Sequence, residues 1–107
     1  MLARQQLGTN AERLVDRMAE AEQVVDRALL ADPANSRVWM ALADLMAVKE
    51  RRQEATRALI LAYELAPDKA KTRRYLENSA KNAARISLRS VYQAAVNSLF
   101  SIRLRGD

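Results

Sequence analysis

Apolar residues recur every three or four positions along most of the chain, which places them on one face of each helix that the pattern predicts. The first run predicts a helix over residues 10–30, whose apolar face carries Leu14, Met18, Ala21, Val25, Ala28 and Leu29. Gly8 and Asn10 are weak helix formers, so the helix is expected to begin beside them. Thr9 and Glu12 have the spacing of a capping box, which supports the same start.

The middle of the chain predicts a pair of helices over residues 36–48 and 53–66. Pro33 lies in the turn before the first helix, where Ser36 can act as a cap, and Pro67 ends the second. Paired helices pack about 8–10 Å apart, which requires small residues where their backbones come closest. The pattern offers three such residues, Ala43, Ala55 and Ala62. We therefore expect a closely packed antiparallel pair.

The last third predicts two more helices, one over residues 69–84 capped by Asp68 and one after a break near residues 85–87. Apolar residues cover about 180° of the final helix, more than packing on one neighbour needs. They are Leu88, Val91, Tyr92, Ala95, Val96, Leu99, Phe100 and Ile102. The helix either packs on two others and closes the end of the domain, or exposes part of this surface to a partner or a second copy. The candidate interface of such a homo-oligomer consists of Val91, Ala95, Leu99 and Ile102.

Eight residues of the middle pair stand at the offsets that define a tetratricopeptide repeat: Trp39, Leu42, Ala43, Met46, Ala55, Leu59, Ala62 and Pro67. Pro33 precedes Pro67 by 34 residues, the period of this repeat class. The chain therefore resembles the tetratricopeptide family. The resemblance implies one all-α domain, a short right-handed superhelix of antiparallel helix pairs with about five helices. It divides the chain into a half repeat at 10–33, a full repeat at 36–67 and a diverged helix pair at 68–104.

The composition excludes most kinds of enzyme. The sequence has no Cys and no His, so it offers no thiol nucleophile, no imidazole base and no zinc site of the usual kind. With two Gly in the whole chain, it has no glycine-rich phosphate loop. Carboxylate pairs such as Asp16 with Glu20 lie on a predicted solvent face, where nothing would raise their pKa. We expect neither catalysis nor a cofactor.

The two ends of the chain show no pattern of a signal peptide or of a membrane-spanning helix. Residues 1–7 lack an apolar run of signal-peptide length, and residues 91–104 are too short and too polar to span a bilayer. The expectation is a soluble, cytoplasmic protein.

The net charge of +5 is unevenly distributed along the chain. Residues 1–67 hold nine basic and ten acidic side chains, whereas residues 68–107 hold nine basic and three acidic ones. A basic end of this kind favours an acidic partner.

In tetratricopeptide proteins the first helix of each repeat lines a binding groove, so the resemblance also implies a partner site. The corresponding residues here are Arg37, Met40 and Asp44 in the full repeat, with Lys71, Arg74, Tyr75, Asn78 and Lys81 in the diverged pair. Their basic side chains can bind carboxylates through charge-assisted hydrogen bonds, while Tyr75 supplies contact area. The expected function is binding of another protein or an acidic peptide, as an adaptor, scaffold or assembly chaperone.

Nucleic-acid binding is the alternative interpretation. The chain has fourteen Arg against four Lys, and its Arg-rich last third contains Tyr75 and Tyr92, which could stack on bases. The aromatic residues stand at helical spacing and are mostly predicted to be buried, and no base-reading motif is present. We therefore expect a protein partner rather than RNA or DNA.

Overall fold

The computed structural model describes the backbone of residues 2–101 and the side chains of residues 17–101, and within that part it consists of five helices and no strand. The helices are α1 (Leu2–Ala31), α2 (Ser36–Val48), α3 (Arg52–Leu65), α4 (Lys69–Asn82) and α5 (Ile86–Phe100). The predicted all-α class with five helices is confirmed.

Polar residues at the helix starts set the boundaries of α2 and α4. Asp68 caps α4 as predicted, since its Oδ1 accepts a hydrogen bond from the backbone N–H of Lys71 at 3.0 Å. The cap of α2 is Asn35 and not Ser36, which is the first helical residue; the Asn35 Oδ1 accepts from the Arg37 N–H at 3.0 Å. Asn and Ser are equally good N-cap residues, so the sequence alone does not show which of Asn35 and Ser36 caps the helix.

The predicted start of the first helix near Asn10 is wrong, because α1 is continuous from Leu2 to Ala31. Gly8, Thr9 and Asn10 lie inside it. Each such residue costs a helix at most about 1 kcal/mol relative to Ala, and the stronger helix formers on both sides offset that cost. The side chains of Thr9 and Glu12, which would form the capping box, lie outside the described part.

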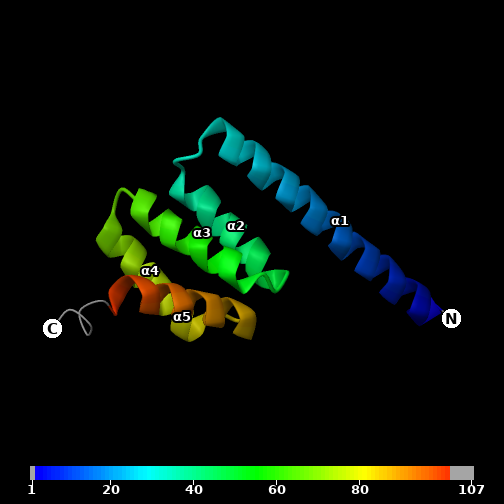
Figure 1. Cartoon of the computed structure of the whole chain (residues 1–107). Helices are drawn as coiled ribbons and strands as arrows, with labels where there is room; N and C mark the ends of the chain where they lie inside the picture. Colours follow the sequence, from blue (N-terminus) through cyan, green and yellow to red (C-terminus); the bar gives the residue numbers. More distant parts are fainter. Residues whose placement is uncertain (1, 102–107) are drawn as a thin grey trace.

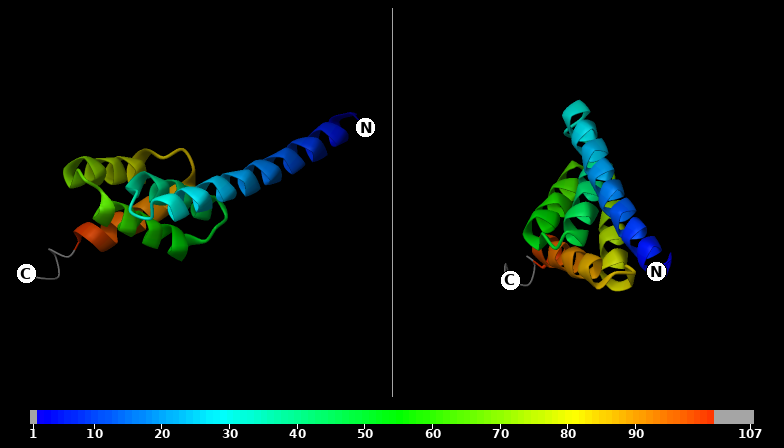
Figure 2. Two further views of the ribbon diagram at one scale, coloured as in Figure 1. Left: turned by 90° about the horizontal axis from the view of Figure 1, so that it is seen from above. Right: turned by 90° about the vertical axis from the view of Figure 1, so that its right-hand side faces the viewer.

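The antiparallel pair α2–α3 occupies the centre of the fold, with α1 along α2 (Figure 1). Helix α5 packs against α2 and α3, and α4 packs mainly on α5 (Figures 1 and 2). The last helix pair, α4–α5, therefore contacts α2 through α5 and not through α4. The carboxyl-terminal half of α1 lies beside α2, while its amino-terminal half extends past the other helices (Figure 2).

The core lies where α2, α3, α4 and α5 meet. Ala43, Ala55 and Ala62 are buried, as the close approach of α2 and α3 requires. The largest fully buried side chains are Leu59, Leu76 and Val91. Trp39 is half-buried at the edge of the core, and its Nε1–H donates a hydrogen bond to the Pro33 carbonyl at 2.7 Å. That bond ties the indole to the turn before α2.

The wide apolar surface of α5 faces the chain's own core. Val91 is 1 % exposed and Ala95 is fully buried, while Leu99 is half-buried against the same core. The candidate interface with a second copy is therefore wrong for Val91 and Ala95, because three neighbouring helices already cover them. Ile102, its fourth residue, lies outside the described residues. Helix α5 contacts α2, α3 and α4, while its role as the end of the domain stays a prediction.

Among residues 2–101, no helix combines the length and the apolar character that crossing a membrane demands.

We expect Leu76→Ala to lower the free energy of unfolding by about 2–5 kcal/mol, because Leu76 is fully buried and the truncation leaves a cavity. Leu30→Ala, at a side chain that is 86 % exposed, should change it by less than about 0.5 kcal/mol. Urea unfolding followed by the fluorescence of Trp39, the only Trp, measures both. Equal losses for the two variants would contradict the assignment of the core.

Candidate functional site

A groove of about 290 Å³ separates the first turns of α2 from those of α4. It is lined by Ser36, Arg37 and Met40 from α2, by Pro67, and by Asp68, Lys71, Thr72 and Tyr75 at the start of α4. We refer to this hollow as the α2–α4 groove. Four of the eight predicted partner-binding residues, Arg37, Met40, Lys71 and Tyr75, therefore surround one space.

Two basic side chains and one acidic side chain line the groove, so its lining carries a net positive charge. Arg37 and Lys71 are exposed, and neither forms an ion pair within the part of the chain whose side chains are described. Asp68 is the one acidic residue of the lining, and one of its carboxylate oxygens accepts the capping bond from the Lys71 N–H. Met40 and Tyr75, which is 49 % exposed, add apolar surface. Such a groove can bind a carboxylate next to an apolar side chain.

Asp44, a fifth predicted groove residue, instead bonds to α5. The hydroxyl of Tyr92 donates a hydrogen bond to the Asp44 Oδ1 at 3.0 Å, and both side chains are largely withdrawn from solvent. The ring of Tyr92 also meets the ring of Tyr75 edge-on, with centroids 6.0 Å apart and an interplanar angle of 74°. Tyr92 thus contacts both helices that form the α2–α4 groove, α2 through Asp44 and α4 through Tyr75. Asp44 therefore connects α2 to α5 and is not among the residues that line the groove.

Burial changes the acid–base properties of this pair. Desolvation raises the pKa of the Asp44 carboxyl above its ordinary value of 3.8, and the hydrogen bond from Tyr92 opposes part of that rise. Desolvation, followed by the nearby Asp44 carboxylate, raises the pKa of Tyr92. Tyr92 therefore keeps its proton and remains a donor to Asp44 throughout the ordinary pH range.

The other three predicted residues lie outside the groove lining. Arg74 is exposed on α4, and the Asn78 Oδ1 accepts a hydrogen bond from the Asn82 amide at 2.8 Å. Lys81 lines a different hollow at the turn between α4 and α5. All three nevertheless belong to the exposed face of α4, because they follow Lys71 at helical spacing.

Arg73, which follows Trp39 by 34 residues, has a structural role that the sequence analysis did not predict. Its guanidinium lies over the Phe100 ring, 4.3 Å from the centroid, and its Nε is 3.4 Å from the Glu77 carboxylate. The i,i+4 spacing of Arg73 and Glu77 was the available signal for the ion pair. The contact with Phe100 depends on how α5 returns over α4.

The nucleic-acid alternative loses two of its candidate groups in this arrangement. Tyr92 is 3 % exposed and so cannot stack on a base, and Arg73 is engaged with Phe100 and Glu77. Tyr75 is the remaining aromatic candidate, and its ring already contacts the ring of Tyr92.

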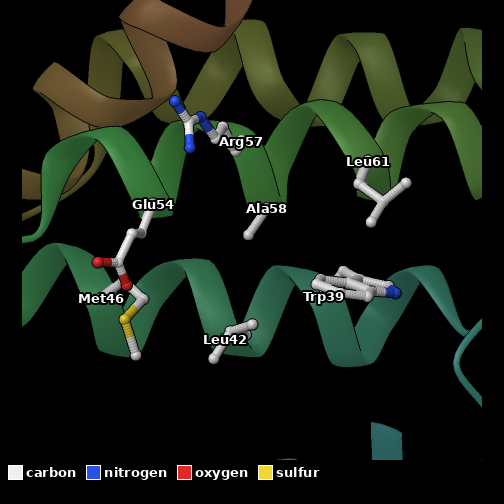
Figure 3. A pocket seen from close by; sticks show the side chains of 7 residues that line it. All are labelled: Trp39, Leu42, Met46, Glu54, Arg57, Ala58 and Leu61. Atoms are coloured by element: carbon white, nitrogen blue, oxygen red, sulfur yellow. The ribbon is translucent and has the colours of Figure 1, made fainter.

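A second, apolar hollow lies between α2 and α3, and we call it the α2–α3 cleft (Figure 3). Its volume is about 280 Å³, and Trp39, Leu42 and Met46 of α2 face Ala58 and Leu61 of α3 across it. Glu54 and Arg57 stand at one end (Figure 3). Trp39 and Met40 are 100° apart on α2, so the cleft and the α2–α4 groove use different faces of one helix. The sequence pattern assigned these apolar residues to the core and did not reveal the cleft.

Comparison of the chain with protein-family models, curated proteins and solved structures finds no match. The tetratricopeptide resemblance therefore rests on the residues that carry it and stays a prediction. No group of three or more acidic side chains in the described part is arranged to hold a metal ion.

We expect Asp44→Asn to change the pH dependence of stability. Because the folded-state pKa of Asp44 is raised, the native protein binds more protons than the unfolded chain above pH 3.8. The stability of the wild type should therefore fall relative to that of Asp44→Asn as the pH rises through the folded-state pKa. Urea unfolding of both proteins from pH 4 to pH 7 measures the difference, and parallel curves would mean that Asp44 is not desolvated.

Proposed function

We propose that this chain is a tetratricopeptide-like module that binds an acidic segment of another protein in the α2–α4 groove. The observation that carries the proposal is the gathering of Arg37, Lys71, Met40 and Tyr75 around one hollow. These residues come from helices 30 or more positions apart in the sequence, at the positions that line the groove in the family that the chain resembles.

Binding in this groove combines two physical contributions. Arg37 and Lys71 attract carboxylates and can form charge-assisted hydrogen bonds with them, which are about twice as strong as neutral ones. Met40 and Tyr75 contribute apolar area that an aliphatic or aromatic side chain of the segment can cover. The contact of Tyr92 with Asp44 and Tyr75 fixes the two walls before binding, which reduces the entropy lost on association.

The proposal is one of binding and not of catalysis. The sequence lacks the Cys and His side chains that most simple mechanisms use. An adaptor, a scaffold or an assembly chaperone in the cytoplasm is the kind of protein that such a module serves. The positive charge of the groove makes acidic segments its preferred targets.

Charge reversal of the groove, Arg37→Glu with Lys71→Glu, should raise the Kd for an acidic peptide at least tenfold, equivalent to about 1.4 kcal/mol. The measurement is fluorescence anisotropy of a fluorescein-labelled peptide that carries alternating Glu and Leu, at low and at physiological salt. Both residues are exposed, so the free energy of unfolding should stay within about 0.5 kcal/mol of the wild type.

The matched control is Arg17→Glu with Arg27→Glu, which changes the net charge equally at exposed positions on α1, outside the groove. An equal loss of affinity in the control would show a general effect of net charge and refute the groove. A single-stranded oligonucleotide of equal charge serves as the competing ligand. If it binds more tightly than the peptide and loses affinity with the groove variant, the function is nucleic-acid binding.

A further inference from the structure

A hollow of about 470 Å³ lies at the turn between α4 and α5, away from the α2–α4 groove. It is lined by Ala80 and Lys81 from the end of α4 and by Ile86, Arg89, Ser90 and Gln93 from the start of α5. We call it the α4–α5 hollow. Two cations, one hydroxyl and one amide thus surround an apolar side chain, Ile86, which is 73 % exposed.

Arg89 is the unusual member of this set. Its Nε is buried yet has no hydrogen-bond partner among the described residues. Buried side-chain donors without a partner are rare in folded proteins, and an arginine donor is satisfied best by an anion. Arg89 lines the α4–α5 hollow and has no acidic partner in the described part of the chain, so its guanidinium can bind a carboxylate there.

The charge around the hollow is uncompensated over a wide area. Residues 78–101 contain no Asp and no Glu. Of the two acidic residues in α4 and its cap, Glu77 pairs with Arg73 and Asp68 caps the helix. No ion pair balances Lys81, Arg85 or Arg89 in the described part of the chain. The region attracts anions before any contact is made.

The exposed face of α4 connects the two hollows. Lys71 lines the α2–α4 groove, Lys81 lines the α4–α5 hollow, and Arg74 and Asn78 are exposed between them. Ten residues of helix separate Lys71 from Lys81, a distance of about 15 Å along the axis. An extended peptide covers that distance with about five residues.

We propose that the α4–α5 hollow is a second anchor for the partner, an extended acidic segment that crosses the exposed face of α4 from the α2–α4 groove. The inference rests on the proposed function and specifies the form of the ligand. It requires two acidic groups about five residues apart, each next to an apolar side chain. A peptide is favoured over nucleic acid because Met40 and Ile86 give each anchor an apolar contact, which a phosphate backbone cannot use.

Two labelled peptides test the second anchor at physiological salt. The short one has a single Glu-Leu-Glu cluster, and the long one carries a second cluster about five residues farther on. Wild-type protein should bind the long peptide at least about tenfold more tightly, because the second contact is intramolecular. Lys81→Glu should remove that advantage and leave the Kd of the short peptide within about twofold, since screening over about 8 Å isolates the two anchors.

Arg89→Gln is the second variant, because it removes the guanidinium without adding a negative charge. It should also lower the affinity for the long peptide alone. Arg27→Glu, with the same charge change as Lys81→Glu at an exposed position on α1, is the control and should affect neither peptide.

The outcomes separate the second anchor from the groove itself. If both peptides bind with equal affinity, or if Lys81→Glu weakens both equally, the second anchor is refuted while the groove stands. If the wild type binds neither peptide, the proposed function fails as well. Tighter binding of an oligonucleotide of equal charge, lost with Lys81→Glu, would overturn the choice of a peptide.

Discussion

The contact of α5 with the α2–α3 pair determines where the candidate binding residues lie. Helix α4 packs mainly on α5, and α5 rather than α4 contacts α2, so the width of the α2–α4 groove is set by α5. Val91 and Ala95 supply the apolar part of this contact. Tyr92 supplies its polar part through the hydrogen bond to Asp44, and the same ring contacts Tyr75 of α4. A side chain that looks like a groove residue in the sequence, Asp44, is thus needed to form the groove.

Helix α2 serves two surfaces of different character because its residues alternate between its faces. Arg37 and Met40 point to the charged groove, while Trp39 and Leu42 point to the apolar α2–α3 cleft (Figure 3). Ala43, between the two faces, packs in the core. The sequence analysis left open whether α5 packs on two helices or exposes part of its apolar surface. In the structure Val91 and Ala95 of α5 are buried, whereas the α2–α3 cleft is an apolar hollow.

The elements that depend on local sequence could be predicted, and those that depend on distant contacts could not. Helix periodicity, the cap at Asp68 and the small residues between α2 and α3 depend on residues close together in the sequence. The structure confirms the predictions made from them. The predicted start of α1 was wrong, because the free energy lost at a few weak helix formers is too small to end a long helix. The bond between Asp44 and Tyr92 spans 48 residues, and no spacing rule relates residues that far apart.

The same limit explains why only half of the candidate groove residues meet in one hollow. A helical-spacing argument can place Lys71, Tyr75 and Asn78 on one face of α4, but not the direction from which α2 approaches that face. Once α5 fixes that direction, the first turns of α4 face α2 across the α2–α4 groove, while its last turn lines a hollow with α5. The basic face of α4 is therefore divided between two hollows. Two separated cationic hollows on one rigid helix fit an extended ligand better than a compact one, because a compact ligand would leave one of them unused.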